Sequence, residues 1–209
     1  MQRNLDIHHP SETLEGFSDF SLLFARRATD VIRHGDAFAA AFGTSIPVGE
    51  TEANPYVLGD AGLPHEHIQF GTGTFDPLAE IYYFTPIEGL LSASGSIVGR
   101  FPLYENDEGY EGPLEVSSTL ALTLAPTDRL SLRAGWSFLY QDYARWDGAK
   151  DVNTGLISSG VVGGASYTLA DGVHLGLDVR VPVSQDTLSD DSDTFEQGTV
   201  AQVGLSYSF

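Results

Sequence analysis

The sequence has no cysteine, a single methionine and few basic residues. Without cysteine, the chain has no disulfide, no thiolate metal site and no cysteine nucleophile. A helix that spans a membrane needs about 20 consecutive apolar residues, and no segment of the chain has them. Only 10 Lys and Arg stand against 29 Asp and Glu, which gives a net charge of −19. This charge excludes nucleic acid, which needs a basic surface, and argues against a simple anion channel.

Apolar and polar residues alternate along most of the chain, with the period of two that is typical of β-strands. In residues 173–183, Leu175 and Leu177 share one face with four valines, whereas Asp178 and Arg180 lie on the other. The aliphatic face needs an apolar environment, and the charged face needs water or an ion partner. A strand between lipid and an aqueous lumen supplies both. The same alternation predicts further strands at 17–28, 37–47, 75–85, 90–101, 114–124, 130–140, 157–169 and 199–209. Stripes with the period of a helix are absent, so we expect no helix.

The connections between these strands alternate in length. The short ones are 29–36, 86–89, 126–129 and 171–172, and the long ones are 49–66, 103–112, 144–153 and 185–196. Outer-membrane barrels have short periplasmic turns and long extracellular loops. With a periplasmic C-terminus, every long loop lies outside the cell, including the acidic runs at 105–108 and 189–193. These runs are either solvated or bind divalent cations beside lipopolysaccharide.

The chain ends in a strand whose apolar face finishes on Phe209. This end resembles the last strand of bacterial outer-membrane barrels. The resemblance implies that Val203, Leu205, Tyr207 and Phe209 form the signal read by the barrel-assembly machinery. We expect this strand to pair with 173–183 and, to close a barrel, with Leu5–His8. Trp136, Phe138, Tyr140 and Tyr143 are expected to supply part of an aromatic girdle.

The strand count predicts one barrel domain, residues 1–209, that is incomplete at its N-terminus. The alternation gives nine strands, whereas barrels of this type have even strand numbers. We expect residues 4–8 to be the end of a further strand, which makes about ten in total. No apolar signal sequence follows Met1, as an exported protein requires. We therefore expect a signal peptide and a further hairpin upstream, for about twelve strands.

Short segments spread along the chain match one family in order. They are LDIHHP at 5–10, GFSDF at 16–20, GTSIPVG at 43–49, FGTGTFDP at 70–77, NTG at 153–155, VPV at 181–183 and the final Phe209. In this order they resemble the outer-membrane family called "MetA-pathway of phenol degradation", a set associated with transport. The resemblance implies a barrel that moves small molecules, aromatic or hydrophobic ones among them. It does not establish a substrate.

Charged residues on the polar faces are the candidates for solute selectivity. They are Asp19, Arg27, Glu80, Arg100, Glu115, Arg133, Asp178 and Arg180. Their mixed signs predict ion pairs across a narrow interior. A barrel of about ten strands lies near the size that side chains fill, so a plugged scaffold and a conducting pore both stay open.

His65, Glu66 and His67 are the candidate metal ligands. Residues two apart share a face of a strand, so the two imidazoles can converge on zinc or copper. The alternative is a surface histidine pair without metal. The Gly71-Thr72-Gly73 segment lacks the Gly-Lys-Ser/Thr end of a phosphate loop and predicts a bend. No catalytic motif is present, so we expect neither an enzyme nor a bound cofactor.

The sequence thus predicts an all-β, antiparallel up-and-down β-barrel in the outer membrane, acting as a channel or transporter. One alternative is a structural anchor or scaffold for a surface assembly. The other is a secreted, acidic β-sandwich that binds Ca²⁺ or carbohydrate, which would bury Leu175, Leu177 and Val179 in a core.

Overall fold

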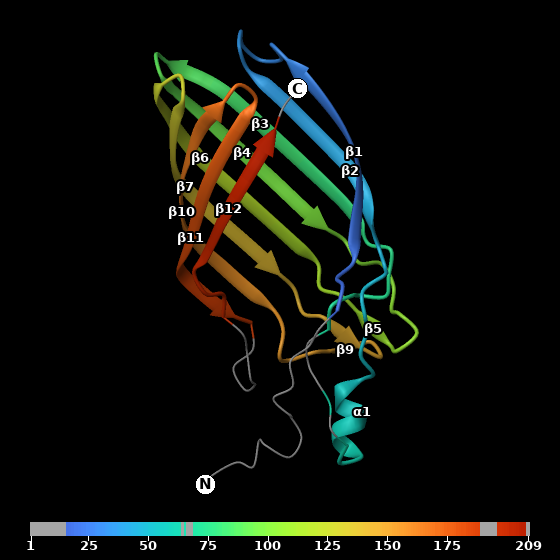
Figure 1. The fold of residues 1–209 in the computed structure, drawn as a ribbon. Helices are drawn as coiled ribbons and strands as arrows, with labels where there is room; N and C mark the ends of the chain where they lie inside the picture. Colours follow the sequence, from blue (N-terminus) through green and yellow to red (C-terminus); the bar gives the residue numbers. More distant parts are fainter. Residues whose placement is uncertain (1–15, 64, 66–68, 189–195, 208–209) are drawn as a thin grey trace.

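The computed structural model of the protein describes residues 16–63, 65, 69–188 and 196–207, and its main element is one antiparallel sheet of nine strands. The strands are β1 (Phe20–Thr29), β2 (Ala37–Ile46), β3 (Pro77–Glu88), β4 (Leu91–Arg100), β6 (Glu115–Thr127), β7 (Leu130–Gln141), β10 (Leu156–Ala170), β11 (Val173–Thr187) and β12 (Val200–Tyr207). Each strand pairs with the next one in this order. Figure 1 shows the sheet curled, with the short turns at one end and the long connections at the other. The predicted all-β, up-and-down architecture is therefore confirmed.

The long connections contain small elements that the alternation did not predict. A three-stranded sheet combines β5 (Tyr110–Glu111), β8 (Arg145–Trp146) and β9 (Ala149–Lys150). The expectation of no helix was wrong, because α1 (Pro55–Asp60) forms in the β2–β3 connection. The Asn54 side chain caps it by accepting from the Tyr56 and Val57 amides, and Pro55 favours its first turn. A helix of 6 residues is too short to show a period in the sequence. Among the described residues, no helix is long and apolar enough to cross a membrane.

The two faces of the sheet differ as the alternation predicted. Leu120 is 70% exposed and Val203 is 71% exposed, and both lie on the outward face with Leu175 and Leu177. Within the described residues, the buried hydrophobic side chains are only Ala121, Ala144, Trp146 and Leu156. A β-sandwich would instead bury its large aliphatic side chains between two sheets. This arrangement contradicts the sandwich alternative.

Outward aromatic side chains are spread along the strands, and Phe24 and Phe42 lie opposite each other near the middle of β1 and β2. Trp136 and Phe138 are exposed on the half of β7 nearer the long connections. Tyr167 and Tyr207 are exposed near the short-turn ends of β10 and β12. Tyr143 lies off this wall, in a connection, where Lys150 Nζ stands 4.5 Å from its ring centroid.

The edges of the sheet are β1 and β12. In the part of the chain that the structure describes, β1 pairs only with β2 and β12 only with β11. The predicted pairing of β12 with β11 is therefore confirmed. The predicted second partner, Leu5–His8, lies outside the described residues, as does Phe209. Closure of the barrel and the assembly signal remain predictions.

Candidate functional site: the inward face of the sheet

Small side chains line much of the inward face. Ala39 of β2, Ser96 of β4 and Thr119 of β6 lie in one cross-strand row with Tyr82 of β3. Rows of Ala, Ser and Thr continue to either side on β2, β4 and β6. Because such side chains are short, the larger inward residues stand over them with free space around them.

Arg133 and Asp178 form an ion pair across three strands. Arg133 lies on β7 and Asp178 on β11, and Gly164 of β10 is paired with both. A Cβ atom at Gly164 would lie 2.2 Å from Asp178 Oδ1, so glycine is required for the pair to pass over β10. The sequence predicted both residues on this face but not that they are partners.

The other inward charges are held mostly by neutral groups. The Arg180 guanidinium donates to Ser137 Oγ at 2.9 Å and to Gln197 Oε1 at 2.8 Å, not to Asp178. Glu80 accepts from the Tyr82 hydroxyl at 2.9 Å, and Glu115 accepts from Gln141. Fewer of the predicted inward charges form ion pairs than their mixed signs suggested.

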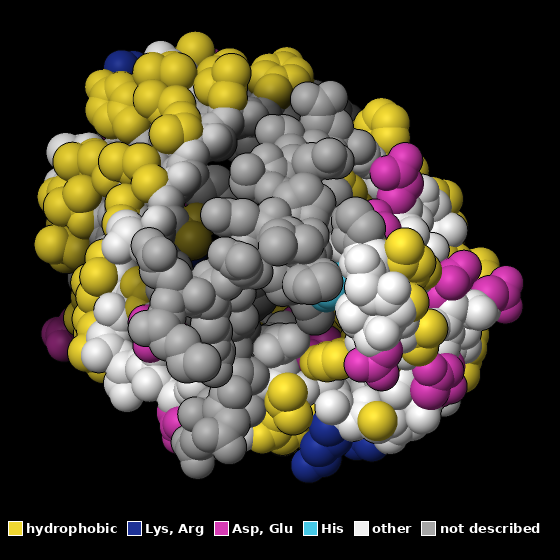
Figure 2. Space-filling model, turned by 90° about the horizontal axis from the view of Figure 1, so that it is seen from below, with side chains coloured by type: hydrophobic (Ala, Val, Ile, Leu, Met, Phe, Trp, Pro, Cys, Tyr) yellow, Lys and Arg dark blue, Asp and Glu magenta, His cyan; other side chains and the backbone are white. Residues whose placement is uncertain are grey.

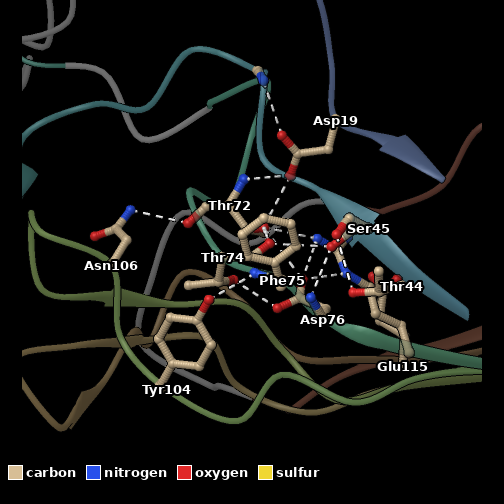
Figure 3. A network of polar contacts seen from close by, with 12 residues as sticks. Asp19, Thr44, Ser45, Thr72, Thr74, Phe75, Asp76, Tyr104, Asn106 and Glu115 are labelled. Carbon is tan, nitrogen blue, oxygen red and sulfur yellow. Dashed lines mark hydrogen bonds and ion pairs between the residues drawn. The ribbon is translucent and has the colours of Figure 1, made fainter. Parts of the chain in front are cut away.

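A buried carboxylate, Asp76, organises the end of the sheet nearest the long connections (Figure 3). Arg100 donates to Asp76 Oδ2 through Nε at 2.8 Å and lies 2.7 Å away through Nη2. The Thr74 hydroxyl donates to Asp76 Oδ1 at 2.6 Å, and the Thr72 hydroxyl to Oδ2 at 3.2 Å. Sequence reasoning placed Arg100 on this face but missed Asp76, Thr72 and Thr74, although all three belong to the FGTGTFDP segment.

Asp19 lies just before β1 and fastens the β2–β3 connection to this network. Its carboxylate accepts from the Gly49 and Thr72 amides, each at 2.9 Å. Gly49 and Gly71 cross closely here, because a Cβ atom on either would lie 2.7 Å from backbone atoms of the other. The bend predicted at residues 71–73 is present, with Gly73 at a φ of 69°. The connection is thus drawn inward at the mouth of the sheet.

The described residues form an outer and an inner cavity on the inward face. The outer cavity, of about 430 Å³, is lined by Asp19, Arg100, Glu115, Gln141 and Gln69, among others. Gln69 accepts a hydrogen bond from the Glu52 amide through Oε1 at 3.1 Å, and its side-chain amide lies beside the Tyr110 hydroxyl. Tyr110 also lines this cavity, and burial raises the pKa of its hydroxyl.

The inner cavity lies nearer the short turns and has a different lining. Its volume is about 470 Å³, and its inward-facing lining includes Arg27, Arg133, Tyr82, Phe84 and Thr119. Five of the eight predicted lumen residues line one of these two cavities, whereas Glu80, Asp178 and Arg180 line neither. Asp19, Arg100 and Glu115 meet at the outer cavity, and Arg27 and Arg133 at the inner one.

A cluster around Asp151 holds the long connections together. Asp151 accepts from the Tyr56 hydroxyl at 2.6 Å, the Trp146 indole at 3.3 Å and the Asn153 amide at 3.0 Å. The Trp146 ring lies 4.8 Å from that of Tyr110 between centroids. This cluster ties α1 to the small sheet beside the outer cavity.

We expect the Asp151 cluster to loosen in alkaline solution. Burial and the Asp151 carboxylate raise the pKa of the Tyr56 hydroxyl. The raised pKa stabilises the fold below the ordinary tyrosine value of about 10, and this stabilisation is lost as the pH rises through the higher folded value. Tyr56→Phe should cost about 1 kcal/mol at pH 8, since Tyr56 is partly exposed. Hydrogen exchange of residues 54–61 and 145–153 measures both the alkaline loosening and the effect of Tyr56→Phe, with Tyr140→Phe on the sheet wall as the control.

Equal exchange in Tyr56→Phe and the wild type at pH 8 would contradict a role of Tyr56 in holding the Asp151 cluster together.

The predicted metal site is only partly within the described residues. His65 Nδ1 lies 3.0 Å from the Leu63 carbonyl oxygen, whereas Glu66 and His67 lie outside the description. The described residues contain no group of three or more His, Asp or Glu that suits a metal ion. The metal site at residues 65–67 remains a prediction.

Comparison with known proteins supports the fold. No family model and no curated protein matches the sequence. Among solved structures, the chain is similar to the COG4313 outer membrane channel from Pseudomonas putida F1, with a TM-score of 0.67 and 10% sequence identity. The similarity covers 92% of this chain and 65% of that channel, so the chain spans less than two thirds of the channel's length. At this identity the likeness shows the fold alone.

Proposed function

We propose that the protein is a bacterial outer-membrane channel that passes small solutes along its inward face. The observation that carries the proposal is the opposite character of the two faces of one wall. On β11, Leu177 is exposed on the outward side, and its neighbour Asp178 is ion-paired on the inward side. Lipid outside and water inside satisfy both side chains. The similarity to a solved outer-membrane channel supports the same function.

The proposed orientation places the short turns in the periplasm and the long connections outside. Figure 2 looks onto the long-connection end and shows hydrophobic side chains along much of the rim and several groups of acidic side chains, most of them on one side. In this orientation the acidic side chains meet lipopolysaccharide and its divalent cations. The strand β12 then ends at the periplasmic side, where the barrel-assembly machinery would bind it.

The cavities favour a channel over a purely structural anchor. An anchor needs no free space inside, and its interior would be filled by side chains, as in small barrels. Here cavities of about 430 and 470 Å³ follow one another along the inward face. Both are lined in part by charged groups.

Reconstitution of the full chain into lipid tests the proposal. We expect discrete conductance steps in planar bilayers, and swelling of vesicles in isosmotic solutions of small sugars or amino acids. Vesicles that lack the protein, and vesicles that contain heat-denatured protein, are the controls. If vesicles with folded protein neither swell nor conduct, the channel function is wrong and the structural anchor is the better explanation.

Asp178→Asn is expected to shift ion preference toward anions. The substitution removes the only carboxylate that pairs with Arg133 among the described residues, which leaves a positive charge on the inward face. We expect the anion-to-cation permeability ratio to rise by about twofold at low salt, since a single charge acts through a partly aqueous lumen. Reversal potentials in a salt gradient give the ratio. Asp107→Asn, in an exposed connection, should leave it unchanged. A ratio unchanged in Asp178→Asn would contradict the selectivity role.

A further inference from the structure

The inner cavity carries an uncompensated positive charge. Its lining contains Arg27 and Arg133 but no Asp or Glu. Arg133 is neutralised by Asp178, whereas no described residue pairs with the Arg27 guanidinium. A guanidinium stays charged at any working pH, and on a wall between lipid and lumen it needs water or an anion. Arg27 is therefore an open site for an anion in a chain that is strongly acidic overall.

Aromatic rings stand beside this guanidinium. Arg27 of β1 and Tyr82 of β3 are both paired with Ala39 of β2, so only a methyl group separates them on this face. Phe84, two residues along, shares the inward face. Tyr82 is 41% exposed and Phe84 is 43% exposed although both point inward, because the small side chains around them leave their rings uncovered. The cavity thus offers one cation beside apolar ring surface.

We propose that the inner cavity binds a small carboxylate that carries a flat apolar ring, and this inference rests on the proposed channel function. The carboxylate accepts hydrogen bonds from Arg27 in the bidentate geometry that guanidinium favours. The ring of the solute packs against Tyr82 and Phe84. A volume of about 470 Å³ lies in the range of small-molecule sites.

The hydrogen bond of Tyr82 sets the direction of the bound solute. The Tyr82 hydroxyl donates to Glu80, which fixes the ring and places a negative charge at its hydroxyl end. Glu80 repels a carboxylate from that end, and Arg27 attracts it to the other. The solute then lies with its charge toward β1 and its ring over β3.

Fluorine NMR on the full chain in detergent micelles tests binding without any need for conductance. The probe is 4-fluorobenzoate, and the matched neutral probe is 4-fluorobenzyl alcohol. We expect saturable binding of the anion by the wild type, weakened by about tenfold or more in Arg27→Gln. Arg27→Lys should lose part of the affinity, because an ammonium keeps the charge but not the bidentate geometry. The neutral probe should not distinguish Arg27→Gln from the wild type.

Arg26→Gln is the matched control, since it removes the same charge one residue away on the outward face of β1. It should bind 4-fluorobenzoate as the wild type does. Tyr82→Leu should weaken binding several-fold through loss of ring contact, with folding of each variant checked by circular dichroism. Equal affinities of Arg27→Gln and Arg26→Gln, or no saturable binding by the wild type, would overturn the inference. A conducting protein without binding refutes this site alone, whereas a folded protein that binds but never conducts refutes the channel alone.

Discussion

Leu177→Arg is expected to lower the free energy of unfolding in lipid by about 2–4 kcal/mol. Leu177 lies within an outward row of aliphatic side chains on β11, opposite the exposed Val203 of β12. An arginine there has to keep its charge in hydrocarbon or drag water and headgroups toward it. Urea unfolding of the protein in phospholipid vesicles, followed by tryptophan fluorescence, measures the change.

The control places the same side chain on the other face. Gln202 of β12 is the cross-strand partner of Asp178, one residue away from Val203. Gln202→Arg should cost less than about 1 kcal/mol, because the new guanidinium reaches Asp178 and the inward solvent. Similar losses for Leu177→Arg and Gln202→Arg would show that the two faces do not meet lipid and water as proposed.

Asp76→Asn is expected to cost about 3 kcal/mol of unfolding free energy. Asp76 is fully buried, forms an ion pair with Arg100, and accepts hydrogen bonds from the Thr72 and Thr74 hydroxyls. Removing one partner of a buried ion pair leaves the other charge uncompensated, at about 3–5 kcal/mol. We expect the lower value because Arg100 remains partly exposed.

The same urea unfolding in vesicles measures Asp76→Asn, with Asp107→Asn as the control. Asp107 is exposed in the connection after β4, and its substitution should change stability by less than about 0.5 kcal/mol. Because Asp76 anchors the mouth of the sheet, the open-channel current of Asp76→Asn should also become noisier. A stability like that of Asp107→Asn would contradict the role of Asp76 as the organiser of this network.

The sequence predicted the strands and their two faces because these are local properties. A period of two assigns Leu177 and Asp178 to opposite sides of a strand without knowledge of any neighbour. The alternation of short and long connections then orders the strands into hairpins. Some strands begin or end at other residues than the alternation predicted. The segment 75–85 begins as β3 only at Pro77, and the Asp76 amide donates to the Ser45 hydroxyl instead of to a backbone carbonyl of β2.

In the candidate site, too, the sequence predicted the face on which a residue lies but not its partners. Asp19, Arg100, Arg133 and Asp178 were predicted from their positions in the pattern. Their partners were not. Asp19 and Arg100 meet residues of the β2–β3 connection, whose path the alternation does not specify, and Arg133 meets Asp178 through the register of three strands. Arg133 meets Asp178 only because β10 inserts Gly164 between them.

By itself, the sequence thus determined an acidic antiparallel wall with an apolar face, a polar face and long connections at one end. Only the tertiary structure decided which charges are neutralised and which stay open. Arg27 and Arg133 look alike in the alternation, yet Arg133 has Asp178 while Arg27 has the Tyr82 ring and free volume. The physical reason is that alternation fixes the face of a side chain, whereas its partners are fixed by strand register and by the small residues that let two distant side chains meet.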